Sequence, residues 1–353
     1  MSGLNAGSAL SAITGAVSDL VTGGSLPAPI KRNAIKAFGE LCSALIDIPV
    51  AKLEGKAAEI RAETGSRVKL IARAAENIAS QMQVDKAYAD VAVERYGKRI
   101  LQQQQNLDNV CAFSATEIKR VKAYSSSSAN SIASGSSESA EPRSFQPDIS
   151  DDWLNSFREQ AILKSSDEMR IIFGKILAGE IVKPGSFSIR SIQIMGQLDV
   201  KPAMLFRRLC SLCISLRPNG TIFDARVPSF GGNASNNSLQ EYGLSFDSLN
   251  VLQEYGLIIS DYNSSLDYRV SVLINNRVGL PFVFGDKQYV LVPSNPNDWM
   301  ANKALKIHGV GLSAAGKELI SIVEAEHNMK FLEAFASFVN DQGLAIKELQ
   351  ASI

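Results

Sequence analysis

A serine-rich stretch divides this chain and constrains its fold more than any other feature. Residues 124–143 read YSSSSANSIASGSSESAEPR and show no apolar periodicity. Such a segment buries too little apolar surface to offset the entropy lost on ordering. Its composition is typical of a flexible linker. We therefore expect a linker over residues 124–147, with folded structure on either side.

The residues before this linker follow helical periods. Pro29 suits the first turn of a helix, and Pro49 should kink or end that helix. The apolar positions behind Pro29 share one helical face: Ile30, Ala34, Phe38, Leu41 and Leu45. A longer run over 50–122 has an apolar seam that steps by three and four residues: Val68, Ile71, Ala75, Ile78 and Met82. The pattern predicts an N-terminal helical bundle or coiled-coil-like region over residues 1–123.

A helical domain is predicted over residues 148–218. Asp151 and Asp152 suit the first turn of a helix, and a second helix should cover 166–182. The segment 183–188, KPGSFS, then makes a sharp corner, because Pro184 ends one helix and Gly185 permits the turn. Ser186 or Ser188 can cap the next helix, and Phe187 can pack the corner against the core. Another helix should run from Lys201 to Leu216.

From residue 219 onward the pattern changes to short β-branched and aromatic runs between turn residues. These runs read TIFDARV, LIISDYN, YRVSVLI, PFVFG and KQYVLVP. Ser245 should cap a compact helix over 245–256, and a strand LKIHGVGL leads into the helix SAAGKELISIVEA. A last helix should cover 328–351. This order resembles a winged-helix domain, so we expect a mainly α protein with a winged-helix-like α+β region and C-terminal helices over 219–353.

The bulk composition excludes several function classes. With 36 basic and 36 acidic residues, the chain has no net field to attract nucleic acid. Its four cysteines are scattered, which suits a reducing cytoplasm and not a disulfide framework: Cys42, Cys111, Cys210 and Cys213. No stretch reaches the roughly 18 strongly apolar residues of a conventional membrane helix.

No catalytic, cofactor-binding or metal-ligating residue is predicted. Phosphate-loop, dinucleotide-binding, nucleophile-elbow and HExxH motifs are missing from the sequence. Cys210 and Cys213 form a CxxC, but they lie in an apolar helix, where cysteines act as small core residues. His308 and His327, the two histidines, lack the further ligands that zinc requires. We expect a non-enzymatic protein with no cofactor and no small-molecule substrate.

The stretch from Trp153 to Leu198 carries a family resemblance. An aromatic-led helix is followed by SSDEM, ILAGEI, PGSFS and a second helix that ends at Leu198. This arrangement resembles a bacterial family catalogued as a domain of unknown function, and it is similar to the abortive-infection alpha-type proteins. The resemblance implies a bacterial accessory protein of mobile-element or antiphage context, and it brings no catalytic residue.

Three functions remain open at this stage. The first is an interaction protein that works through oligomerisation and protein contacts, with the oligomer depending on residues 50–122. The second is a winged-helix DNA-binding regulator. Asn250 and Gln253 could read bases, but the helix over 245–256 has no basic residue, and Arg269 and Arg277 on the ribbon compensate little.

The third function is a membrane-active effector that uses residues 1–24. Small residues recur there every four positions, at Gly3, Gly7, Ser11 and Gly15, the spacing that lets membrane helices approach closely. The alternative is a helix rich in small residues that packs on the bundle, or a partly disordered tail. The N-terminus has no basic start before its apolar stretch, so no signal peptide is expected.

Overall fold

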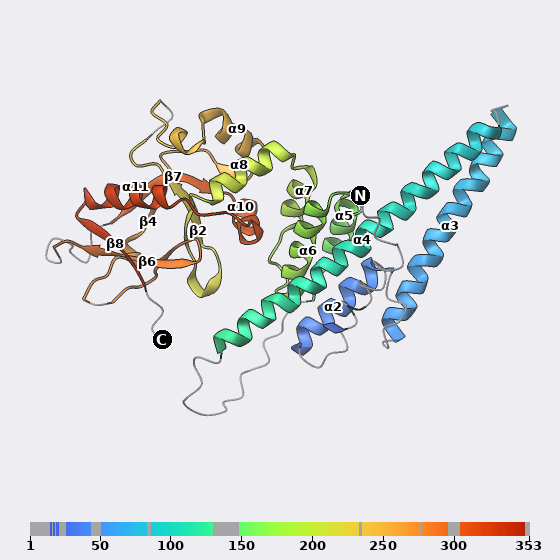
Figure 1. The fold of residues 1–353 in the computed structure, drawn as a ribbon, viewed down its shortest axis with the longest axis horizontal. Helices are drawn as coiled ribbons and strands as arrows, with labels where there is room; N and C mark the ends of the chain where they lie inside the picture. Colours follow the sequence, from blue (N-terminus) through green and yellow to red (C-terminus); the bar gives the residue numbers. More distant parts are fainter. Residues whose placement is uncertain are drawn as a thin grey trace. The chain divides into compact units, whose positions relative to one another are not determined.

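The protein is described by a computed structural model in which the chain divides into two compact units. The units are Met1–Gly196 and Gln197–Ile353 (Figure 1). The described residues are 15, 17, 19–20, 26–43, 51–82, 86–129, 148–232, 235–275, 277–295 and 304–349. Most of them lie in helices, and the strands lie in the second unit, so the protein is mainly α with an α+β part, as predicted.

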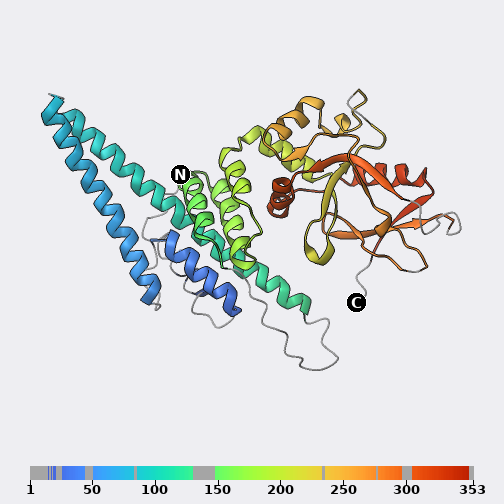
Figure 2. The same ribbon diagram turned by 180° about the vertical axis from the view of Figure 1, so that it is seen from behind.

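The first unit is built from helices. They are α2 (Ala28–Leu41), α3 (Ala51–Met82), α4 (Lys86–Ala129), α5 (Asp151–Ala161), α6 (Asp167–Val182) and α7 (Ile189–Gln197). Helices α3 and α4 lie side by side and run in opposite directions, as Figure 1 and the reverse view in Figure 2 show. The end of α3 toward Met82 and the start of α4 from Lys86 therefore form a hairpin of two helices, and we call these the upper parts of α3 and α4.

The helix starts predicted from the sequence are confirmed at α5 and α6. The Ser150 hydroxyl accepts a hydrogen bond from Trp153 N, and the Ser166 hydroxyl accepts one from Met169 N. Acidic side chains occupy the first turn of each helix, where they interact favourably with the helix dipole.

The core of the first unit lies where α4, α5 and α6 meet. Phe157 is fully buried, with its ring 5.0 Å from Trp153 and 5.6 Å from Phe173. Gly174 brings α6 very close to α4, because a Cβ built on this glycine would lie only 2.6 Å from the Cβ of Phe113. The lower half of α4 is thus enclosed by other helices.

The second unit contains an eight-stranded sheet in which the paired strands run antiparallel. The order is β3-β7-β2-β1-β5-β6-β8, with β4 also paired to β7. The strands are β1 (Ile214–Leu216), β2 (Asp224–Pro228), β3 (Ile258–Ile259), β4 (Ser265–Asp267), β5 (Phe282–Phe284), β6 (Lys287–Pro293), β7 (Lys306–Leu312) and β8 (Leu344–Glu348). The helices of this unit are α8 (Val200–Cys210), α9 (Phe246–Glu254), α10 (Ala314–Leu319) and α11 (Met329–Asn340).

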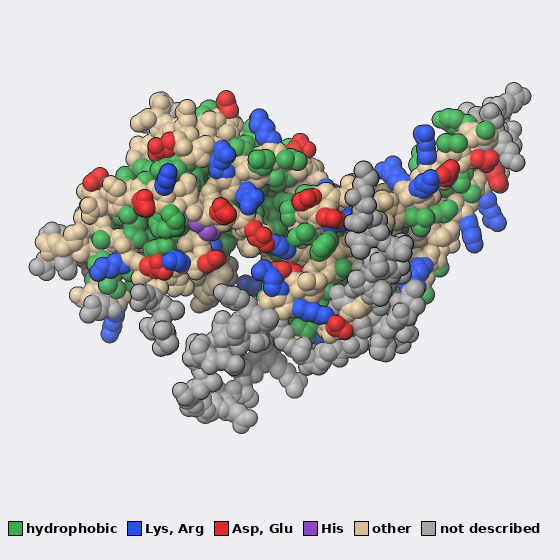
Figure 3. All heavy atoms as spheres, in the orientation of Figure 1, with side chains coloured by type: hydrophobic (Ala, Val, Ile, Leu, Met, Phe, Trp, Pro, Cys, Tyr) green, Lys and Arg blue, Asp and Glu red, His purple; other side chains and the backbone are tan. Residues whose placement is uncertain are grey.

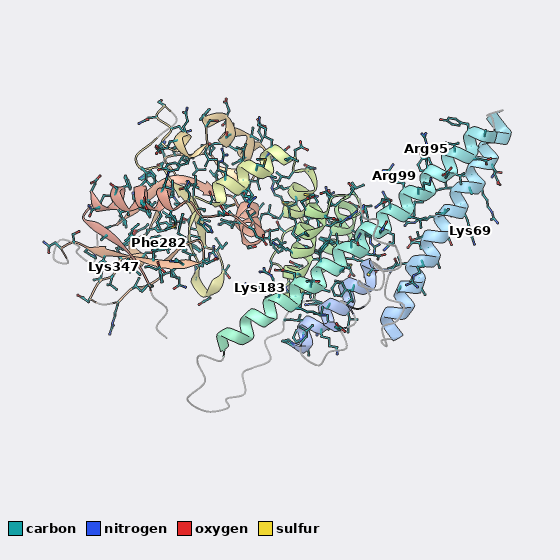
Figure 4. The ribbon with its side chains drawn as sticks, in the orientation of Figure 1. Lys69, Arg95, Arg99, Lys183, Phe282 and Lys347 are labelled. Atoms are coloured by element: carbon teal, nitrogen blue, oxygen red, sulfur yellow. The ribbon has the colours of Figure 1, made fainter. Side chains whose placement is uncertain are left out.

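Aromatic side chains hold α11 against the sheet. Phe282 of β5, labelled in Figure 4, meets Tyr289 of β6 at 5.6 Å and Phe335 of α11 at 5.9 Å between ring centroids. Phe331 and Phe335 are both fully buried. Pairs of this kind add to the area that they bury.

Two predicted helices are wrong in their C-terminal parts. The helix expected over 201–216 ends at Cys210, and Ile214–Leu216 forms β1, whose residues are all buried between β2 and β5. The helix expected over 328–351 ends at Asn340, and Leu344–Glu348 forms β8 against β6. In both places long-range strand pairing overrides a helical apolar pattern.

Two smaller expectations also need correction. Within YRVSVLI, residues Arg269–Ser271 form a short 3₁₀ helix instead of a strand. At the predicted linker, α4 continues to Ala129, so residues 124–129 are helical. Residues 130–147 lie outside the described part of the chain, as does Pro49.

Candidate interaction surface on the helical hairpin

The α3–α4 hairpin has a thin core. Val68 faces Gly97, whose Cβ, if present, would lie 3.6 Å from Val68 Cγ1. The fully buried residues of this contact are small: Ala57, Ala89 and Gly97. The larger inward-facing side chains stay half-exposed: Ile60, Val68, Ile71, Val93 and Ile100. Two helices cannot enclose a core by themselves, so the hairpin has the composition of an unfinished bundle.

Large apolar and aromatic side chains point into solvent along the same hairpin. We call this set the hairpin surface; its members are Leu70, Tyr88, Val91, Tyr96 and Leu101. Tyr88 is 72% exposed, Leu70 63%, Leu101 61% and Tyr96 54%. Scattered exposed apolar residues are ordinary, but a concentration of them on one projecting element marks an interaction site.

Charged side chains of both signs surround the hairpin surface. Figure 4 shows Arg95 and Arg99 projecting from α4 on the side away from α3, while Lys69 projects from α3. Ion pairs one helical turn apart link Arg67 to Glu63 and Lys98 to Glu94. On the face that Figure 3 shows, hydrophobic, basic and acidic side chains of the hairpin lie close together. Tyrosine and arginine are enriched in protein interfaces, which fits this mixture.

Arg226, Asp224 and Tyr268 form a buried polar cluster in the second unit. Arg226 contacts both Asp224 oxygens, at 2.7 and 2.9 Å, and donates to Ile307 O at 2.9 Å. The Tyr268 hydroxyl donates to Asp224 Oδ2 at 2.8 Å. Burial raises the pKa of Tyr268 well above its ordinary value, so the phenol stays protonated. This arrangement holds β2 to its neighbours and leaves no free acid or base.

The CxxC pair lies at the end of α8 and just beyond it. Cys210 is 2% exposed and Cys213 is 4% exposed, and both are free thiols. Burial raises the pKa of each thiol, which disfavours the thiolate form. Within the described ranges, no group of three or more His, Cys, Asp or Glu could hold a metal ion.

The two histidines lie apart. His308 is an exposed residue of β7, with Nδ1 3.2 Å from Asn263 O. His327 precedes α11 and meets Phe284 edge-on at 5.4 Å between ring centroids. Burial lowers the pKa of His327, although nearby Asp286 acts in the opposite direction. The ring of His327 hydrogen-bonds to the backbone of Ser211 inside the CxxC, but these groups form no metal-binding set within the described residues.

The proposed base-reading residues are placed poorly for DNA. Asn250 is half-buried on α9, and Gln253 Oε1 already accepts a hydrogen bond from Ser260 N at 3.2 Å. The exposed charges of α9 are acidic, Asp247 and Glu254. Arg269 lies in a 3₁₀ helix and not on a ribbon. Phosphate binding by α9 is therefore unfavourable.

The N-terminal segment 1–24 lies mostly outside the described residues. Where it is described, Val17 is fully buried, Leu20 is 3% exposed, and Asp19 pairs with Lys119 of α4 at 3.2 Å. These contacts favour a segment that packs on the protein. Across the described ranges, no helix has the length and apolar character needed to cross a membrane. A membrane role for the first 24 residues stays a prediction.

The KPGSFS corner is a structural joint, as predicted. Gly185 adopts a left-handed conformation at φ +84°, and the Ser188 hydroxyl accepts from Ser191 N at 3.3 Å. Phe187 is 3% exposed, and its carbonyl accepts from Trp153 Nε1 at 2.7 Å. Sequence reasoning missed Glu180, a 3% exposed carboxylate that accepts from Gly185 N at 2.7 Å and Phe187 N at 3.1 Å.

Together, the fold and the hairpin surface define a class of protein. It is a mainly helical protein with a projecting two-helix hairpin and an α+β unit, and its described residues form no metal-binding group of His, Cys, Asp or Glu.

The chain belongs to the family described as "Protein of unknown function (DUF2806)", which matches residues 116–336. This match confirms the resemblance to a domain of unknown function, while the likeness to abortive-infection proteins stays a prediction. No curated protein and no solved structure matches the chain. The matched residues begin near the lower end of α4, so the hairpin surface lies outside them.

Proposed function

We propose that this protein is a non-enzymatic interaction protein that self-associates through the α3–α4 hairpin. The observation that carries the proposal is the exposure of Leu70, Tyr88, Tyr96 and Leu101 on a hairpin whose own core is thin. A second hairpin packed on the face that carries Leu101 would cover this side chain and complete a four-helix bundle.

The free energy gained by covering exposed apolar side chains can offset the cost of association. Burying a large apolar side chain contributes about 1.5–3 kcal/mol relative to leaving it exposed. Several such side chains per copy can offset the rigid-body entropy that association costs, about 4–15 kcal/mol. The same side chains gain nothing in a solitary hairpin.

Light scattering coupled to size exclusion tests this proposal on the full chain. The wild-type protein should have twice the 38.0 kDa mass of one chain. The variant Val91→Ser/Leu101→Ser should have the mass of one chain, because the contact loses the exposed apolar side chains of its face.

The matched control removes apolar side chains of equal exposure elsewhere. Val200 and Met204 lie one turn apart on α8 and are 77% and 65% exposed. Val200→Ser/Met204→Ser should keep the wild-type mass. A wild-type protein that runs as a single chain at all concentrations would refute self-association.

We further propose that α8, α9, β3, β7 and α10 form a winged-helix-like unit that serves protein contacts. Helix α9 leads directly into β3, which pairs with β7, and α10 follows β7. Gly316 supports this packing, because a Cβ there would lie 2.1 Å from the carbonyl oxygen of Leu257. The acidic charges on α9 favour a protein partner over DNA.

A DNA shift assay at low and moderate salt separates these two uses of the unit. We expect no shift at either salt concentration. A shift that weakens with salt and is lost in Asn250→Ala/Gln253→Ala would show that the unit binds DNA.

The antiphage role rests on the resemblance of the 175–199 corner to abortive-infection proteins. We propose that such a role would depend on hairpin association. Plaque counts on a bacterial lawn that expresses wild-type protein or the Val91→Ser/Leu101→Ser variant would test it. Equal plaque counts with and without the wild-type protein would contradict an antiphage role.

A further inference from the structure

We propose that two copies of this chain pair their hairpins face to face with both tips at the same end, so that α3 of each copy lies against α4 of the other. This inference rests on the proposed self-association and specifies its geometry. It follows from the positions of particular residues along the two helices, from the directions in which they point, and from their charges.

The contact between Val68 and Gly97 fixes the heights of residues along the hairpin. Because the two helices are antiparallel, a residue that lies n positions after Val68 on α3 is level with the residue n positions before Gly97 on α4. Each step changes the height by about 1.5 Å. Lys69 and Arg73 on α3 therefore lie within about 3 Å in height of Glu94 on α4.

Helical rotation places these charges on one broad face. Around the helix axis, at about 100° per residue in the chain direction, Lys69 and Arg73 point about 100° and 140° onward from the direction of Val68. In the same way, Asp90 and Glu94 point about 20° and 60° onward from the direction of Gly97. Because the two helices are antiparallel, onward rotation turns both of them toward the same face. Lys69, Arg73, Asp90 and Glu94 are all exposed.

The charges of this face are self-complementary. The α3 edge has a net charge of +1 and the α4 edge a net charge of −1, counting Lys69, Arg73 and Glu76 on α3 and Asp90, Glu94 and Lys98 on α4. A two-fold axis parallel to the hairpin places each α3 edge at the height of the other copy's α4 edge. Complementary edge charges select the partner and its direction in helical bundles.

One apolar side chain and one gap also match across this axis. Leu101, 61% exposed, is turned about 40° onward from Gly97, and Gly65 is turned about 60° onward from Val68. They differ in height by about 1.5 Å. A Cβ on Gly65 would meet nothing within 4 Å, so the space above it is open. Leu101 of each copy can therefore pack over Gly65 of the other.

The alternative face-to-face pairing is disfavoured. With the tips at opposite ends, α3 would lie against α3 and α4 against α4. Lys69 and Arg73 would then face their own counterparts, and so would Asp90 and Glu94. Like charges in direct opposition are destabilising.

A charge-exchange experiment on the full chain tests the arrangement. Lys69→Glu/Arg73→Glu alone should raise the dimer dissociation constant about tenfold or more, because attraction becomes repulsion. Asp90→Lys/Glu94→Lys alone should do the same. An equimolar mixture of the two variants should form a heterodimer about as tight as the wild-type dimer, which also shows that both variants fold.

Arg95→Glu/Arg99→Glu provides the matched control. These arginines are also an exposed pair one turn apart on α4, but they project from its outer side. This variant should stay dimeric. A wild-type dimer whose charge-exchanged variants associate normally, or fail to rescue each other, would overturn the proposed geometry. A monomeric wild-type protein would instead overturn self-association itself.

Discussion

The two halves of α4 lie in opposite environments although they belong to one continuous helix. Its upper half, residues 86–105, packs mainly on α3 and carries exposed Tyr88, Tyr96 and Leu101. Its lower half, residues 106–118, is enclosed by α2, α5 and α6, and its buried residues include Leu107 and Ile118. Six residues thus separate Leu101, 61% exposed, from Leu107, 3% exposed.

This difference shows what a helix gains from its neighbours. In the lower half, three further helices supply apolar contacts, while Ile162 O accepts a hydrogen bond from Asn106 and Ser43 donates to Asp108. In the upper half, the one available partner leaves apolar side chains in water. This contrast underlies our proposal that a second copy of the chain covers the exposed half.

The largest expected effect comes from the leucine pair that defines the contrast. Leu107→Ala should lower the free energy of unfolding by about 3 kcal/mol, because it leaves a cavity in a closed core. Leu101→Ala should change the monomer's stability by less than about 0.5 kcal/mol. Urea titrations at concentrations below the dimer dissociation constant would measure both. Equal losses of unfolding free energy in the two variants would contradict the difference between the two halves of α4.

Two glycines of the first unit should show the same contrast: substitution of Gly174, on α6, should cost more stability than substitution of Gly97 in the hairpin. Gly174→Val should destabilise the protein by about 2 kcal/mol, because the side chain would collide with Phe113 and the backbone of Ser114. Gly97→Ala is the control, since the nearest atom is 3.6 Å from its Cβ position. Thermal unfolding should show a large drop in melting temperature for the first variant only. A tolerated Gly174→Val would mean that α4 and α6 are less tightly packed.

A smaller loss is expected at the border between the halves. Asp108 Oδ1 and Oδ2 accept hydrogen bonds from Ser43 N and the Ser43 hydroxyl, each at 2.7 Å. Asp108→Ala should cost about 1–2 kcal/mol, because these donors lose their partner in a half-buried site. Gln105→Ala, on an exposed position of α4, is the control. Chemical denaturation of both variants would show whether the polar network anchors the end of α2.

The smallest effect concerns an exposed ion pair of the upper half. The hydrogen bond and charge of Lys98 lower the pKa of Glu94 below its ordinary value of 4.5. A lowered pKa in the folded state contributes stability above pH 4.5 that is lost as the pH falls through the folded pKa. NMR titration should show the pKa of Glu94 returning to its ordinary value in Lys98→Met. An unchanged pKa in that variant would show that Lys98 does not cause the shift.

The sequence predicted the local features well where one residue type dictates the geometry. Pro184 and Gly185 located the corner, and the pair Asp151 and Asp152 and the cap Ser245 located helix starts. It failed at Ile214–Leu216 and Leu344–Glu348, because their strand character depends on partners far along the chain. A helical period in an apolar run cannot reveal a distant strand.

The hairpin surface was predicted only in part. The seam through Val68 and Ile71 indicated a helical hairpin or coiled coil, and this hairpin is present. The exposure of Tyr88, Tyr96 and Leu101 could not be read from the sequence, because it depends on which helices fail to reach the upper half. The sequence signal for this exposure was that apolar residues also occur at positions outside the predicted seam. The role of Glu180 depends on the fold of the corner, so no short motif marks it.

Hydrogen–deuterium exchange at two protein concentrations, with the mass measured at each, tests the central claim most directly. The account predicts that amides of residues 86–105 exchange more slowly at the higher concentration, while those of residues 106–118 keep the same rate. The mass should rise from 38.0 kDa toward twice that value over the same range. Equal exchange in the upper half at both concentrations, with a constant mass of 38.0 kDa, would contradict it.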